Sequence, residues 1–100
     1  MAKAPVRQLL ISPLAEFDLA EIWAYIAEDS PKAATDFVAK ITNKFEPLLG
    51  FPGIGSTRDQ IATDLRALPY KNHVIYYTFT DDHVIIVRVV HGARDVRALF

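Results

Sequence analysis

Two Ser-Pro pairs, Ser12-Pro13 and Ser30-Pro31, each stand directly before a stretch of apolar residues with helical spacing. Serine is a favoured N-cap, and proline at the first helical position loses nothing, because the N–H that it lacks would have no partner there. Gly50 and Pro52 end the second stretch. The two stretches are close together in the chain, so we expect an antiparallel helical hairpin. The apolar stripes of its helices are Ala15, Leu19, Ile22, Trp23 and Ile26, and then Ala34, Phe37, Val38, Ile41, Phe45, Leu48 and Leu49.

Segments typical of strands precede and follow this hairpin. Residues 6–11 (VRQLLI) predict a short strand, and residues 60–68 (QIATDLRAL) alternate between two faces as a strand would. Residues 73–79 and 84–90 are rich in β-branched and aromatic residues, and the short polar segment between them predicts a tight hairpin. The last segment is apolar on both faces except at Arg88, which favours a central place in the sheet. The order β-α-α-β-β-β therefore predicts an α+β fold, with the helical hairpin packed on one face of a small antiparallel sheet.

Composition limits the classes of function. One hundred residues suit one core, so we expect a single domain over residues 1–100. The chain has no cysteine, and His73, His83 and His91 lack the spacing of a metal site, so we expect no metal and no cofactor. The net charge of −1 argues against direct nucleic-acid binding. No apolar run approaches the roughly 20 residues of a membrane span. The apolar stretch near the start of the sequence is too short for a signal peptide, so the expected location is the cytoplasm.

Arginines are the most informative charged residues of the second half of the chain. A buried charge without a partner is costly, so Arg88 should either form an internal ion pair with Asp64 or Asp95 or line a recognition groove. Solvation alone accounts for Arg94 and Arg97, because both follow the last strand on a terminal segment. The sequence shows no motif of a serine nucleophile or a phosphate-binding loop. Composition and spacing therefore indicate a small α+β domain that is not an enzyme.

The most specific motif lies at the end of the last predicted strand. The run VIIVRVVHGARD (84–95), preceded by LRALPYKNHVIYY (65–77) and by DLAEIWAYIAEDSPKAATDFV (18–38), resembles the ParE branch of the RelE/ParE toxin superfamily. Its most distinctive piece is V-x-H-G-A-R-D at 89–95, and P-G-I-G at 52–55 supports it. The resemblance extends over almost the whole chain. It implies the β-α-α-β-β-β layout and the role of a toxin in a type II toxin–antitoxin pair.

The superfamily contains two kinds of activity: RelE-like members cut messenger RNA in the ribosome, and ParE-like members poison DNA gyrase. The nuclease branch carries two lysines just before a Leu-Arg pair, an arginine that opens the next strand, an arginine in the tail and a tyrosine near the C-terminus. At these positions the chain has Ala62, Asp64, His73, Arg94 and Phe100. Asp64 would repel a scissile phosphate, and Phe100 has no hydroxyl to carry a proton. The resemblance therefore favours the non-enzymatic ParE branch.

The resemblance implies DNA gyrase as the target, bound so that its cleaved-DNA state persists. We assign target contact to Arg94, Arg97, Leu99 and Phe100, because an aromatic end beside cationic groups is typical of an interface hot spot. The residues expected to position this tail are Arg88, His91 and Asp95.

The second implied partner is a ParD-like antitoxin. A domain with two helices and one sheet cannot cover all of its apolar surface, and the apolar fraction of 51% fits a protein with a permanent partner. Residues 6–11 could also offer an edge for strand addition. We expect Trp23 to pack on the sheet, and the candidate antitoxin contacts are Leu9, Leu14, Phe17 and Tyr25. Two alternatives stay open: a RelE-like ribosome-dependent mRNA endoribonuclease, and a degenerate toxin that only binds its antitoxin.

Overall fold

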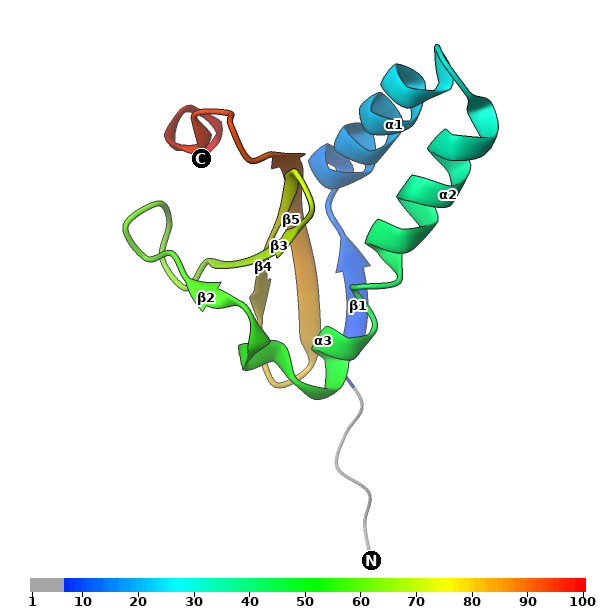
Figure 1. Ribbon diagram of the computed structural model, residues 1–100. Coiled ribbons are helices and arrows are strands. Elements are labelled where there is room, and N and C mark those ends of the chain that lie inside the picture. Colours follow the sequence, from blue (N-terminus) through cyan, green and yellow to red (C-terminus); the bar gives the residue numbers. More distant parts are fainter. Residues whose placement is uncertain (1–6) are drawn as a thin grey trace, which may run out of the picture.

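The computed structural model describes residues 7–100 and places a helical hairpin against a five-stranded sheet (Figure 1). The α+β class and the order of the predicted elements are confirmed, with short helical turns and a two-residue strand added between them. Val6 of the predicted first strand lies outside the described residues. The elements are β1 (Gln8–Ile11), α1 (Pro13–Ala27), α2 (Pro31–Thr42), α3 (Pro47–Gly50), the 3₁₀ turn η1 (Pro52–Ile54), β2 (Ser56–Thr57), β3 (Arg66–Tyr70), β4 (His73–Phe79), β5 (His83–His91) and the 3₁₀ turn η2 (Val96–Leu99).

The sheet is mixed, whereas the sequence predicted an antiparallel one. Its strand order is β1-β5-β4-β3-β2, and β1 runs parallel to β5 while the other pairs are antiparallel. A parallel pair needs a long crossover, and the helical hairpin with the strands that follow it supplies one. β5 lies between β1 and β4, as expected for a strand that is apolar on both faces.

Both predicted N-caps are present. The hydroxyl of Ser12 accepts a hydrogen bond from the N–H of Ala15 (3.0 Å), and that of Ser30 accepts one from the N–H of Ala33 (3.1 Å). Each bond satisfies an N–H that the helix itself leaves without a partner. The two caps therefore fix where α1 and α2 begin.

The second helix is shorter than its apolar stripe predicted. α2 ends at Thr42, and the stripe continues in α3. Pro47 explains the break, because a proline inside a helix removes one hydrogen bond and clashes with the preceding turn. It stands instead at the start of α3. Phe45 and Leu48 are nevertheless buried, so the stripe predicted burial correctly but not the helix end.

The prediction of a strand that begins at residue 60 is wrong. Residues 59–64 form turns, and β3 begins only at Arg66. Asp64 adopts a positive φ of 61°, and the carboxylate of Asp59 accepts a hydrogen bond from its N–H (2.9 Å). Aspartate tolerates this conformation better than most residues. The alternating pattern therefore belongs to a turn, and its apolar residues Ile61 and Ala62 still pack against the core.

Apolar side chains are buried on both faces of the sheet. The larger cluster lies between the sheet and the helices and includes Phe45, Leu48 and Tyr77. The smaller cluster lies on the opposite face and consists of Leu65, Ala67, Tyr76 and Val90, covered by the turn at 59–64 and by the C-terminal tail. Figure 1 shows the helices and the red tail on opposite sides of the sheet. No helix within residues 7–100 has the length and hydropathy of a membrane span.

Candidate functional site

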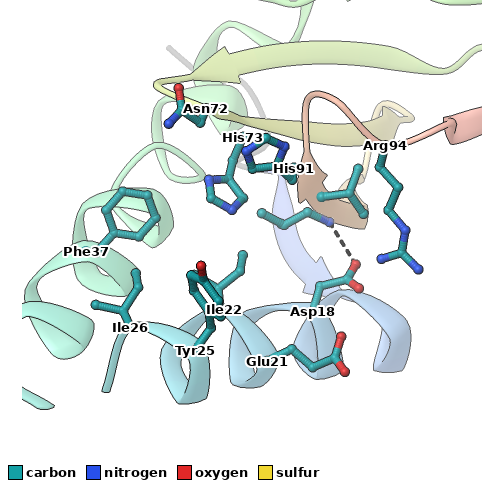
Figure 2. Close-up of a pocket in the computed structure, with 12 residues that line it drawn as sticks. Asp18, Glu21, Ile22, Tyr25, Ile26, Phe37, Asn72, His73, His91 and Arg94 are labelled. Atoms are coloured by element: carbon teal, nitrogen blue, oxygen red, sulfur yellow. Dashed lines mark hydrogen bonds between the residues drawn. The ribbon is translucent and has the colours of Figure 1, made fainter. Parts of the chain in front are cut away.

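A cleft of about 550 Å³ lies between the helical hairpin and the end of the sheet where β5 finishes (Figure 2). It combines an apolar floor with a polar rim, which is the usual composition of a binding site. Its apolar lining consists of Ile22, Ile26, Phe37 and Val89, together with Val90, which also belongs to the smaller cluster. The rim includes Glu21, Tyr25, Asn72, His73, His91 and Arg94.

A buried ion pair lies beside this cleft. The guanidinium of Arg88 donates two hydrogen bonds to the carboxylate of Asp18, from Nε and Nη2, each 2.8 Å long. The N–H of Val89 donates a third bond to the same carboxylate (3.0 Å). The hydrogen bonds from Arg88 to Asp18 raise the pKa of Arg88. The pair joins α1 to β5 and satisfies both charges, so it belongs to the framework that holds the cleft open.

The predicted partner of Arg88 is therefore wrong. Neither Asp64 nor Asp95 pairs with it, because Asp64 lies in an exposed turn and Asp95 in the tail. Sequence analysis missed Asp18, although a signal was present. Asp18 is three residues after Ala15 and four before Ile22, so it lies on the apolar stripe of α1. A carboxylate on a buried stripe indicates a buried cation elsewhere in the chain.

Two histidines form the upper end of the cleft. His73 and His91 are partners across β4 and β5, and their rings meet edge to face with centroids 5.4 Å apart. Phe37 contacts the other side of the His73 ring at the same centroid distance. Burial lowers the pKa of His73, and the neighbouring His91 lowers it further. His73 is therefore held in its neutral form at pH 7.

The two rings differ in their hydrogen bonds. Nδ1 of His91 accepts a bond from the N–H of Ala93 (3.1 Å), so neutral His91 carries its proton on Nε2. Nδ1 of His73 is buried and has no hydrogen-bond partner among the described residues. His73 thus carries a buried polar atom beside the cleft that the described residues leave unsatisfied. Within residues 7–100, no three acidic or histidine side chains gather as a metal site would require.

The C-terminal tail folds back against the second face of the sheet. Asp95 caps η2 by accepting a hydrogen bond from the N–H of Arg97 (3.2 Å), and its carboxylate lies 3.9 Å from Nε of Arg97. Leu99 packs on the smaller cluster, and the ring of Phe100 lies 5.5 Å from that of Tyr76. Phe100 remains 40% exposed. Asp95 therefore lies where it can position the tail.

The four residues assigned to target contact do not form one cluster. Arg94 lines the cleft on the helical side, where Figure 2 shows its side chain reaching toward α1. Leu99 packs on the opposite face of the sheet, and Phe100 and Arg97 belong to the same tail segment. The tail therefore presents two separate surfaces, one formed by Arg94 with the cleft and one by Arg97, Leu99 and Phe100.

The candidate antitoxin contacts are mostly exposed. Leu14, Phe17 and Tyr25 are exposed residues of α1, and Tyr25 reaches 77% exposure. Leu9 packs against the main core, so the exposed leucine of β1 is Leu10. β1 is the last strand of the sheet on its side, which leaves an edge for strand addition.

Trp23 does not pack on the sheet as expected. Its indole Nε1 donates a hydrogen bond to Oγ1 of Thr35 in α2 (3.1 Å), and the side chain is partly exposed. Trp23 therefore links the two helices on the outside of the hairpin.

The positions of the nuclease set are scattered. His73 and Arg94 line the same cleft on the helical face, whereas Ala62 and Asp64 lie in the turn on the second face and Phe100 packs on Tyr76. Acid–base catalysis on one phosphate would need these positions to converge within hydrogen-bond reach. Only His73 and Arg94 share a site in this fold, and the other three positions lie away from it.

Comparisons with known proteins agree with the fold and the motif. The family of the ParE toxin of the type II toxin–antitoxin system parDE matches residues 9–96. Toxin ParE1 of Caulobacter vibrioides is 27% identical over 89 residues, which cover 88% of this chain and 92% of that protein.

Two solved structures share the fold. One, from the chromosomal ParDE system of P. aeruginosa, has a TM-score of 0.74 and 20% identity, and the match covers 86% of this chain and 96% of the other. The second, from the RelBE2 toxin–antitoxin complex of Mycobacterium tuberculosis, has a TM-score of 0.59 and 18% identity, covering 94% and 100%. Because the family match covers most of the chain, the protein belongs to the ParE toxin family of type II toxin–antitoxin systems.

Proposed function

We propose that this toxin stops growth by binding DNA gyrase and stabilising its cleaved-DNA state. The observation that carries the proposal is the tail, which presents the exposed guanidinium of Arg97 beside a partly exposed Phe100. Tyr76 anchors the ring of Phe100 from below, so the aromatic group is held in place before it meets a partner. A fixed aromatic beside arginine is the composition of an interface hot spot.

Action by binding, without bond chemistry, also fits the rest of the molecule. The residues at the nuclease positions lie on both faces of the sheet, and Asp64 among them would repel a phosphate. The net charge of −1 gives little attraction toward ribosomal RNA. A ribonuclease would need both a converged site and a cationic surface around it.

A ParD-like antitoxin is the second proposed partner. Leu14, Phe17 and Tyr25 leave large apolar area on α1 in solvent, and the cleft continues from Tyr25 toward the sheet. An amphipathic segment of an antitoxin would cover both. The relatives named above come from parDE and RelBE2 systems, which supports this pairing.

Shortening the tail tests the gyrase proposal. Phe100→Ala, or removal of residues 97–100, should abolish growth arrest on induced expression and inhibition of purified gyrase. Because these residues contribute only to the smaller cluster, the far-UV circular dichroism of the variants should stay unchanged. Ala98→Ser, an exposed change in the same segment, is the matched control and should remain toxic.

The same cultures distinguish the alternatives. DNA damage and filamentation while translation continues are the expected response. Immediate translation arrest with cut messenger RNA would identify a ribonuclease, and normal growth with intact antitoxin binding would identify a degenerate toxin. Full toxicity of the shortened chain would remove the tail from the target contact.

A further inference from the structure

The exposed apolar side chains fall into separate groups. One group lies on β1 and α1, where the antitoxin is proposed to bind, and Phe100 lies in the tail. Two others stand apart: Phe51 is 72% exposed and Ile54 is 57% exposed. Both belong to residues 51–55, which we call the knuckle and which contain the P-G-I-G motif. Neither the cleft nor the tail explains them.

The backbone of the knuckle is fixed from below by a buried tyrosine. The hydroxyl of Tyr77 donates a hydrogen bond to the carbonyl of Pro52 (2.6 Å) and accepts one from the N–H of Gly55 (2.8 Å). Nη1 of Arg66 adds a bond to the carbonyl of Gly55 (2.7 Å). A phenylalanine would fill the same core space, so the hydroxyl of Tyr77 serves the knuckle and not the packing.

Gly55 makes this approach possible. A Cβ atom at this position would lie 2.6 Å from the hydroxyl oxygen of Tyr77 and 2.9 Å from the carbonyl oxygen of Ala67. Only glycine lets the loop come so close to the sheet. The knuckle is thus an ordered loop that holds two large apolar side chains in water. Its order is established before any partner arrives, which lowers the entropy lost on association.

Two arginines lie beside the knuckle, and one of them, Arg66, shares a small pocket with Asp59 and Asp64. Nε of Arg7 donates to the carbonyl of Thr80 (2.8 Å), and its Nη1 donates to the carbonyl of Leu49 (3.3 Å), two residues before Phe51. Arg66 lies on the knuckle carbonyls. Among the described residues, neither guanidinium forms an ion pair with a carboxylate. A partner would therefore gain by placing carboxylates around an apolar pocket.

The position of the knuckle separates it from the proposed antitoxin surface. The bonds of Arg7 tie α3 to the turn before β5, so the knuckle lies where β5 begins. The cleft lies where β5 ends, and Figure 1 shows these regions at opposite ends of the sheet. An antitoxin segment that covers α1 and the cleft would leave the knuckle uncovered.

We propose that the knuckle is a contact surface for the toxin's protein target, seating Phe51 and Ile54 in an apolar pocket edged by carboxylates. The inference rests on the proposed function only in requiring that the target is a protein. Together with the tail, the knuckle gives the toxin a second contact region on that target.

Matched substitutions test the proposal in induced cultures and with purified gyrase. The double variant Phe51→Ser with Ile54→Ser should need about tenfold more toxin for the same growth arrest and gyrase inhibition. Phe51→Leu with Ile54→Val keeps most of the apolar surface and should lose clearly less activity than the serine pair. Both pairs change exposed side chains, so thermal unfolding should be unchanged, and the affinity for the antitoxin encoded with the toxin should be retained.

Tyr77→Phe tests the role of preorganisation. It leaves Phe51 and Ile54 in place but removes the hydroxyl that holds the loop, and it should give a smaller loss of toxicity than the serine pair. If folded Tyr77→Phe is as toxic as the wild type, the hydrogen bonds of the Tyr77 hydroxyl to the knuckle do not contribute to target binding.

Other outcomes would overturn the assignment. Full toxicity of the serine pair would exclude the knuckle from target contact. If the serine pair loses affinity for the antitoxin but stays toxic, the knuckle binds the antitoxin. If the serine pair converts a dimer to a monomer in light scattering, the knuckle binds a second copy of the chain. If the serine pair loses toxicity while wild-type toxin leaves both purified gyrase active and messenger RNA intact, the knuckle proposal stands and gyrase is the wrong target. A wild-type chain without toxicity would overturn both proposals.

Discussion

The two faces of the sheet bury their apolar side chains by different means. On one face, α1 and α2 supply regular stripes that meet β4 and β5 in the larger cluster. On the other, an irregular turn at 59–64 and the tail cover the smaller cluster only in part, since Val96 and Leu99 are half-buried. The helical face combines this regular core with the cleft at the end of β5. The irregular face leaves Arg97 and Phe100 at the surface, and irregular segments are where binding residues are commonly found.

The ion pair on the helical face should give the largest effect. Asp18→Ala leaves the buried guanidinium of Arg88 without its partner, and we expect a loss of about 3–5 kcal/mol in the free energy of unfolding. Urea denaturation followed by circular dichroism measures it. The double variant Asp18→Leu with Arg88→Met removes both charges and should recover much of the loss. A loss below about 1 kcal/mol for Asp18→Ala would mean that water reaches the pair.

Two leucine truncations compare the faces directly. Leu48 is fully buried in the larger cluster, so Leu48→Ala should cost about 2–5 kcal/mol of unfolding free energy. Leu99 is half-buried in the tail, so Leu99→Ala should cost less than about 1.5 kcal/mol, because part of its surface is already in water. If urea denaturation gives the same loss of unfolding free energy for both variants, the tail is as firmly packed as the helices. That result would contradict the difference between the two faces.

His73 should add a smaller, pH-dependent effect at one end of the helical face. The pKa of His73 lies below its ordinary value of 6.5, so between the two values the unfolded chain binds more protons than the folded one. The stability from neutral His73 is therefore present above pH 6.5 and is lost as the pH falls through the folded pKa. We expect a lower melting temperature at pH 5 than at pH 7.5. His73→Phe should flatten this dependence, and an unchanged slope would assign it to other groups.

Local features of the sequence predicted the framework because their physical causes lie within a few residues. Ser12 and Ser30 cap helices through bonds to N–H groups three residues away. The hairpin of β4 and β5 followed from two β-branched segments and the short polar turn between them. The break at Pro47 was also readable, because proline in a helical stripe predicts it regardless of tertiary contacts.

The candidate site was predictable only in part. His91 and Arg94 were recognised from the V-x-H-G-A-R-D motif, and both line the cleft. The motif did not show that Arg94 faces the helices while Leu99 packs on the other side of the sheet. The turn after β5, closed by a hydrogen bond from the N–H of Arg94 to the carbonyl of His91, leads the chain from one side to the other. Which surface a tail residue joins depends on that turn and on the strands beneath it.

The sequence by itself determined the fold class, the helix starts, the central place of β5 and the family, since each rests on local periodicity or a contiguous motif. Tertiary structure alone decided the partner of Arg88, the direction of β1 and the hydrogen bonds of Tyr77 to the knuckle. Arg88 and Asp18 are 70 residues apart, and Tyr77 and Pro52 are 25 apart. Which distant groups meet depends on how the whole chain packs, because a long loop closes at a cost that varies little with its length and so favours no particular pair.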